Sequence, residues 1–215
     1  MQVTTTMQET PETLLPPAAG DVLDFWFGDA LTLGWPSQSR SAFWFQGGKA
    51  LDDDIARRFG ALVEQALQGG LGDWESAPHR RLALVILLDQ FTRNVYRHQA
   101  QAFAGDRRAQ RLVQDALGRG WENPLPLAGK VFLFMPLMHA EDPALQDQCV
   151  RCFETLLTHA PPERQQDLQG NLDFARQHRD IIARFGRFPY RNQVLGRADT
   201  QEEREFLRDG PRFGQ

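Results

Sequence analysis

The sequence contains little cysteine, little lysine and no long apolar segment. Its two cysteines, Cys149 and Cys152, are too few for the disulfide framework that stabilises small secreted domains. Only Lys49 and Lys130 are lysines, so arginine accounts for 22 of the 24 basic residues. The longest apolar run, Leu82–Leu88, has seven residues, which is far too short to cross a membrane. The sequence therefore predicts neither a disulfide scaffold nor a membrane-spanning protein.

A basic surface is also lacking. The formal net charge is −4, so no overall positive field attracts the chain to nucleic acid or to an anionic membrane. Residues 1–19 are rich in Thr, Gln, Glu and Pro, without the basic start and apolar centre of a signal peptide. We interpret them as a disordered tail, and we expect a cytoplasmic protein with neither a nucleic-acid partner nor a membrane partner.

Residues 20–215 have the composition of one globular domain. Hydrophobic residues make up 41% of the chain and charged residues 24%, which is typical of folded proteins. Apolar residues recur at helical spacing, most clearly over residues 49–68, and no segment shows a convincing alternation with the period of two that marks a strand. The pattern predicts a single all-α domain.

Start and stop signals place the expected helices. A short helix capped by Asp21 leads to an aromatic anchor at Phe43–Phe45. Longer helices are expected at 49–68, 78–92, 106–117, 126–138, 143–158, 163–185 and 200–208. Pro136 should kink or break its helix, and Thr200 and Glu203 should form a capping box. Because consecutive helices with short loops pack antiparallel, we predict a multihelical TPR-like array of antiparallel helical hairpins.

Three polar segments interrupt this apolar background, and the first is Asp89–Arg97. It directly continues the fully apolar run, and Asp89 and Arg93 lie four residues apart, where they can pair on one helix face. A charge beside a buried helix is costly unless it is paired. The segment is either a structural ion pair or the floor of a pocket, in which Arg93 and Asn94 would face a polar ligand.

The second polar segment contains His139 and Glu141, between a proline-containing apolar helix and a well-capped one. A His-x-Glu pair can supply an acid and a base, or two metal ligands. It does not have a recognised zinc spacing, such as two histidines four residues apart on a helix. A structural histidine is the simpler interpretation of this segment alone.

The third polar segment, residues 178–197, carries five arginines and a single acid, Asp180. The arginines are Arg179, Arg184, Arg187, Arg191 and Arg197. Gly186 and Pro189 turn the chain, so some of these arginines, together with Asn192, should lie on a loop. They either bind helix C-termini and carboxylates such as Asp89 and Glu141, or they form a site for a carboxylate or a phosphate.

The pair Cys149 and Cys152 has the CxxC spacing of redox and zinc sites. Both cysteines fall on the apolar face of the helix expected at 143–158, far from its N-terminus, where a thiol pKa would be lowered. One such pair is at most half of a zinc site. We interpret both as buried core residues.

Four stretches of the chain together resemble a known bacterial family. They are Val22–Phe27, Leu88–Asn94, Pro136–Glu141 and Arg184–Arg197. They are similar to motifs of the uncharacterised family called domain of unknown function nine-twenty-four, and the resemblance runs over residues 20–208. It implies a multihelical fold similar to TPR-like superhelices, and it implies no established activity. Thr92 stands where the family usually has proline, and Tyr190, where histidine is common, weakens any model that needs a histidine there.

Three functional hypotheses follow. The first is a polar pocket for a small anionic ligand, a carboxylate or a phosphate, in a protein that could be an enzyme. Its ligand-binding residues would be Arg93, Asn94, Arg184, Arg187, Arg191 and Asn192. Its catalytic candidates would be His139 and His178, oriented by Asp89 or Glu141.

The other two hypotheses belong to different classes. One is a TPR-like protein-interaction module without chemistry, which would expose an aromatic strip near Trp35 and Phe43–Phe45. The other is a metal-dependent hydrolase that uses His139, Glu141, His178 and Asp89. The residues indicate no particular cofactor and leave the oligomeric state open.

Overall fold

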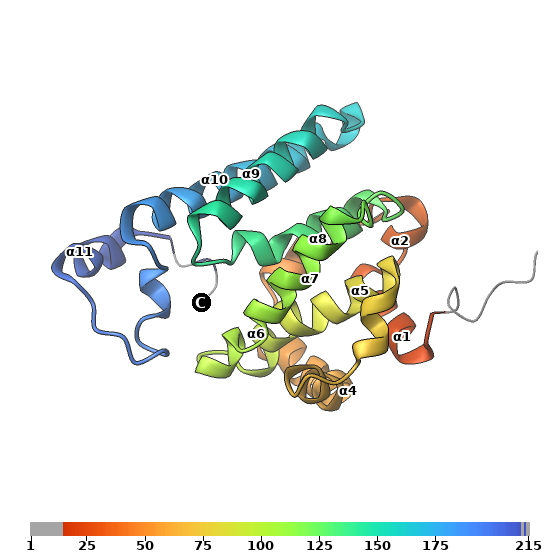
Figure 1. The fold of residues 1–215 in the computed structure, drawn as a ribbon, viewed down its shortest axis with the longest axis horizontal. Helices are drawn as coiled ribbons and strands as arrows, with labels where there is room; N and C mark the ends of the chain where they lie inside the picture. The colour runs from red at the N-terminus through yellow and green to blue at the C-terminus, as the bar shows by residue number, and fades with distance from the viewer. Residues whose placement is uncertain (1–14, 212, 214–215) are drawn as a thin grey trace, which may run out of the picture.

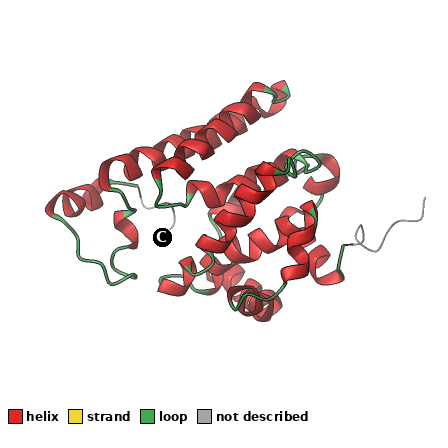
Figure 2. Ribbon diagram, in the orientation of Figure 1, coloured by secondary structure: helices red, strands yellow, loops and turns green. Residues whose placement is uncertain are grey.

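The computed structural model describes residues 15–211 and residue 213, and every regular element within them is helical (Figures 1 and 2). The all-α prediction is therefore confirmed, while the TPR-like hairpin array stays a prediction. The α-helices are α1 (Pro17–Phe27), α2 (Ala30–Leu33), α3 (Ser41–Phe45), α4 (Lys49–Leu67), α5 (Pro78–Val85), α6 (Thr92–Val95), α7 (Asp106–Gly118), α8 (Leu127–Met138), α9 (Pro143–Thr158), α10 (Gln165–Phe185) and α11 (Gln201–Asp209).

The N-terminal helix begins earlier than the sequence suggested. Helix α1 starts at Pro17 rather than after a cap at Asp21, because a proline in the first turn already has the helical φ and needs no donor there. Most of the predicted tail, residues 1–14, lies outside the described residues. Ala19 is buried in the core, so the last residues of that predicted tail belong to the helical domain.

The central helix is longer and less regular than expected. Helix α5 continues into a π-helical turn, η2 (Ile86–Phe91), and then into α6, so the helical path runs to Val95. Helix α8 does not break at Pro136, which lies inside it. Almost every residue of α8 is buried, and packing of this kind stabilises a helix against one missing backbone hydrogen bond.

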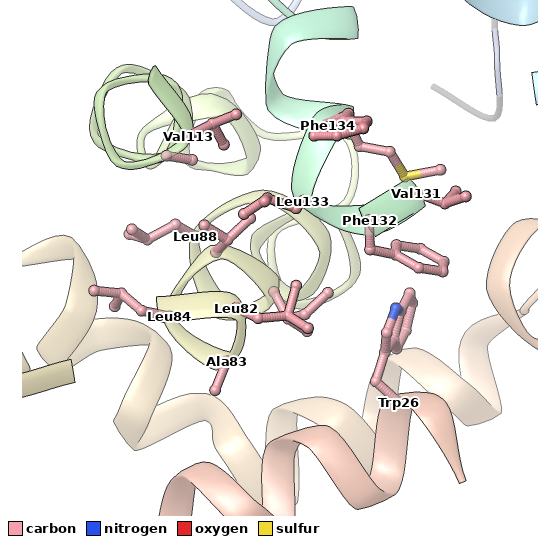
Figure 3. Packing of buried hydrophobic residues seen from close by; sticks show 14 of the residues in the cluster. Trp26, Leu82, Ala83, Leu84, Leu88, Val113, Val131, Phe132, Leu133 and Phe134 are labelled. Atoms are coloured by element: carbon pink, nitrogen blue, oxygen red, sulfur yellow. The ribbon is translucent and has the colours of Figure 1, made fainter. Parts of the chain in front are cut away.

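The main apolar core lies between α1, α4, α5, α7 and α8. Figure 3 shows Trp26 from α1 facing Phe132 from α8, and Leu82 and Leu88 from the central helix in the same core. All four side chains are buried. Edge-to-face contacts, such as the one between Trp26 and Phe132 at 5.5 Å, add to the apolar burial.

A second, smaller apolar cluster lies at the C-terminal end of the described chain. Its buried members are Ile181, Ile182 and Phe188, with Phe206 from α11 packed against them. Helices α9 and α10 run side by side, and α11 lies at the end of α10 far from the α9–α10 turn (Figure 1). The two apolar clusters leave polar side chains between them, and these build the candidate site.

Caps predicted from the sequence fix the helices near that junction. Asp142 accepts hydrogen bonds from the backbone of Ala144 and Leu145 at the start of α9. Thr200 and Glu203 form the predicted capping box of α11. In the described part of the chain, no helix combines the length and the apolar character needed to cross a membrane.

Candidate functional site

Seven polar residues from six elements meet between the two apolar clusters, and we call them the ionic centre. They come from the π-turn, α6, α7, the end of α8, α10 and the 3₁₀ turn η5 (Pro189–Arg191), and they are Asp89, Arg93, Asp106, His139, His178, Tyr190 and Arg191. Most are buried, and Asp89 has no exposed surface.

Asp89 and His139 form the core of this centre. His139 Nδ1 lies 2.8 Å from Asp89 Oδ1, and Gln90 Nε2 donates to the other carboxylate oxygen at 2.6 Å. Asp89 lies in the π-turn, an irregular helical geometry that is frequent at functional sites. Thr92 closes this turn with a hydrogen bond from its hydroxyl to the carbonyl of Leu88 at 2.9 Å. The π-turn thus points a fixed carboxylate at the imidazole.

The charge states of this pair follow from their surroundings. Burial alone would raise the pKa of Asp89, but the Arg93 charge and the bond to His139 lower it further than burial raises it. Burial lowers the pKa of His139 more than Asp89 raises it. At neutral pH, Asp89 is therefore a carboxylate and His139 a neutral imidazole that donates its Nδ1 proton to it. The lone pair of His139 then lies on Nε2.

His178 stands beside His139, with 6.2 Å between the ring centroids. Its Nδ1 donates to the carbonyl of Phe174 at 2.8 Å, so its lone pair is also on Nε2. Burial, together with the neighbouring His139, lowers the pKa of His178 to about 3. The ring of Phe213 stacks on His178 at 3.8 Å and shields it from water.

Arg93, Asp106 and Arg191 complete the charge balance. Arg93 binds Asp106 through two nitrogens, at 3.0 and 3.2 Å, and lies 3.3 Å from Asp89. Arg191 reaches Asp106 at 3.3 Å, and its guanidinium carbon lies 4.5 Å from the centre of the Phe103 ring. Two carboxylates thus face two guanidinium groups. Arg191 Nε is buried without a hydrogen-bond partner among the described residues.

A small cavity reaches this centre from outside. Arg93 and Tyr190 line it together with Arg97, His98, Gln99, Phe103 and Val194. Its volume of about 30 Å³ holds one or two water molecules, or one small anionic group. Burial raises the pKa of Tyr190 to about 12, so its hydroxyl remains protonated.

The remaining predicted site residues lie elsewhere. Arg184 and Arg187 pair with acids of α11, Glu202 and Glu203. Asn192 binds Asp199, and Asn94 binds Asp52 on α4. Glu141 pairs with Arg197 at 2.6 Å and accepts the backbone N–H of Phe188 at 2.8 Å. These residues hold the C-terminal segment and α4 in place instead of lining the ionic centre.

Asp106 is the member of the centre that the sequence interpretation missed. It appeared only as a cap for α7, although it is the first residue of that helix. A signal was present, because Asp106 is the one acid between Asp89 and Asp115, in a stretch that contains five arginines. Local charge balance would have marked it as a partner for a buried guanidinium.

Two other features bear on the alternative hypotheses. Trp35, Trp44, Phe45 and Phe132 line a groove of about 60 Å³, and 54% of Phe45 is exposed. Among the described residues, no three His, Cys, Asp or Glu side chains gather in an arrangement that could hold a metal ion. Cys149 is buried and Cys152 partly buried, both as free thiols whose pKa is raised by burial.

Comparisons with known proteins point to a family without an assigned activity. A family model described as bacterial protein of unknown function (DUF924) matches residues 22–211. A solved structure of a protein of unknown function from Agrobacterium tumefaciens is similar, with 34% identity and a TM-score of 0.72. The match covers 89% of this chain and 97% of that one. A search of curated proteins found no match.

Proposed function

The chain belongs to the bacterial DUF924 family, and within that family we propose that the ionic centre binds the anionic group of a small molecule and acts on it by acid–base chemistry. The observation that supports this most is the hydrogen bond between Asp89 and His139 inside an interior that also gathers Arg93 and Arg191. Burying two ion pairs is seldom the cheapest way to stabilise a core. Perturbed pKa values of this kind cluster at functional sites.

His139 is the acid–base residue of the proposal. Its Nδ1 is held by Asp89, which leaves Nε2 free to take a proton from water or from a substrate. Asp89 then stabilises the imidazolium that forms, because its carboxylate is 2.8 Å away and cannot leave the π-turn. His178 keeps the neighbouring space uncharged, since its own pKa of about 3 leaves it neutral at neutral pH.

The anionic group of the ligand would enter the cavity beside Tyr190. Two donors line it: the protonated Tyr190 hydroxyl and the guanidinium of Arg93. Because the cavity is small, only the anionic group of the ligand would enter it, and the rest of the ligand would lie outside. The sequence hypothesis of a small anionic ligand is thus kept, with Tyr190 added to its residues.

The two alternatives have less support. The interaction module would use the aromatic groove at Phe45, but no described feature indicates what covers it. The metal-dependent hydrolase would need several free ligands. Glu141 is already bound to Arg197 and Phe188, and among the described residues no three His, Cys, Asp or Glu side chains gather where they could hold a metal ion.

The test compares the two tyrosines of the chain. Thermal unfolding is measured with a panel of small carboxylates and phosphate monoesters for the native protein, Tyr190→Phe and Tyr96→Phe. At least one ligand should raise the Tm of the native protein and of Tyr96→Phe, because Tyr96 lies outside the cavity. The shift should shrink in Tyr190→Phe by the equivalent of about tenfold in affinity.

The acid–base role has its own measurement. His139→Gln keeps a hydrogen bond to Asp89 but cannot take up a proton, so ligand binding should lose its pH dependence while some affinity remains. Equal Tm shifts in Tyr190→Phe and the native protein, over the whole panel, would contradict the binding proposal.

A further inference from the structure

A larger pocket lies on the other face of α7, away from the ionic centre. It has a volume of about 600 Å³, within the usual range for small-molecule sites. Four arginines line it, together with two acids, and these are Arg81, Arg108, Arg111, Arg119, Glu75 and Asp115. It shares no residue with the cavity at Tyr190. We call it the α7 pocket.

Each of the two acids of the α7 pocket is bound by arginine through one carboxylate oxygen. Glu75 accepts two hydrogen bonds from Arg108, at 3.2 and 2.7 Å. Asp115 accepts from Arg81 at 2.5 Å and from Arg119 at 2.8 Å. The hydrogen bond from Arg81 is the largest cause of a lowered pKa at Asp115, which therefore stays ionised. Four positive charges against two negative ones leave an excess of two.

That excess is carried by side chains that face solvent. Arg111 is exposed and forms no hydrogen bond or ion pair with the described residues, while Arg119 uses only Nε to bind Asp115. The arginines beneath them are fixed: Arg81 is 4% exposed and lies 4.4 Å from the ring centre of Trp121. The pocket therefore has a rigid basic floor and two guanidinium groups with unused donors.

This pocket differs from the arginine segment at residues 178–197. Each of those five arginines has a carboxylate of the same chain within 3.3 Å, so each guanidinium charge is already paired. We propose that the α7 pocket is a binding site for a small molecule with two anionic groups, phosphates or carboxylates. Guanidinium forks bind both groups through paired hydrogen bonds, and a dianion matches the charge excess.

The test measures binding by calorimetry with two probes, pyrophosphate for phosphate ligands and succinate for carboxylate ligands. Arg111→Gln removes the unpaired charge, and Arg107→Gln is the matched control, because Arg107 is an exposed arginine of α7 outside the pocket. At least one probe should bind the native protein saturably. Its Kd should rise about tenfold in Arg111→Gln and stay unchanged in Arg107→Gln.

His139→Gln separates this site from the ionic centre, and probe binding at the α7 pocket should be unchanged by it. Three outcomes overturn the inference: neither probe binds saturably, both arginine variants weaken binding equally, or His139→Gln abolishes it. Equal weakening would mean diffuse attraction to α7, and loss in His139→Gln would place the probe at the ionic centre. Whichever probe binds more tightly identifies the chemical class of the ligand.

Discussion

Each charged side chain of the ionic centre has a partner of opposite charge, and each histidine there is neutral. Asp89 and Asp106 face Arg93 and Arg191, while burial keeps His139 and His178 unprotonated. Adding a proton to either imidazole would put a third positive charge into this balanced interior. The folded centre should therefore resist protonation, and acid should lower the stability of the fold.

His178 determines in which direction the unfolding free energy changes with pH. Its pKa falls from 6.5 to about 3 on folding, so below pH 6.5 the unfolded chain binds a proton that the folded chain does not. The unfolding free energy should fall as pH drops through this window, by at most about 1.4 kcal/mol per pH unit for this group. Denaturant unfolding of the native protein and of His178→Phe measures it, and the variant should show the shallower dependence.

His159→Phe is the control for that series. His159 is exposed at the end of α9, so its removal should leave the pH dependence as in the native protein. Identical slopes in His178→Phe and the native protein would show that His178 titrates normally in the fold.

At the scale of elements, the backbone of the π-turn packs closely against the backbone at the start of α7. A Cβ added to Gly105 would lie 2.2 Å from the backbone oxygen of Leu88, closer than any real contact. Glycine therefore allows α7 to begin where Asp106 meets Arg93. The helices themselves could be predicted from apolar spacing and caps. The π-turn could not be predicted, because it depends on tertiary packing, and Gly105, which packs against it, looks like an ordinary loop glycine in the sequence.

Gly105→Ala should separate these two elements. The added Cβ would meet backbone atoms of Leu88, so relief requires a helix shift, and the cost should be about 1–3 kcal/mol of unfolding free energy. Gly60→Ala in α4 is the matched substitution with nothing within 4 Å, and it should stabilise by about 0.5–1 kcal/mol. Chemical denaturation of both variants gives the comparison. A neutral Gly105→Ala would mean that α7 does not fix the centre.

At the scale of the whole molecule, the ionic centre joins two apolar clusters of unequal size. The pairing of Asp89 with Arg93 could be predicted, because four-residue spacing is local. The meeting of Asp89 with His139, fifty residues away, required the tertiary fold. The arginines of residues 178–197 were ambiguous for the same reason, since their partners lie on other helices. The sequence showed which residues were unusual, and packing decided which of them meet.

The small C-terminal cluster should open independently of the main core. It has only three buried apolar members. Arg197 connects it to the α8–α9 loop, because its guanidinium binds both Glu141 in that loop and the carbonyl of Phe188 in the cluster. In native-state hydrogen exchange, amides of α11 and of Phe188–Arg191 should therefore exchange at lower free energy than amides of α5 and α8. Arg197→Gln should lower the protection of the C-terminal amides alone, by about 1–3 kcal/mol.

Arg184→Gln provides the comparison for that experiment. Its pair with Glu202 joins two side chains that are both more than half exposed, so its loss should change protection little. Because the α5 amides report the main core, they should be the same in both variants and in the native protein. If Arg197→Gln lowered protection equally in α5 and α11, the two clusters would unfold as one cooperative unit, and the ionic centre would lie inside that unit instead of at a boundary that ligands can open.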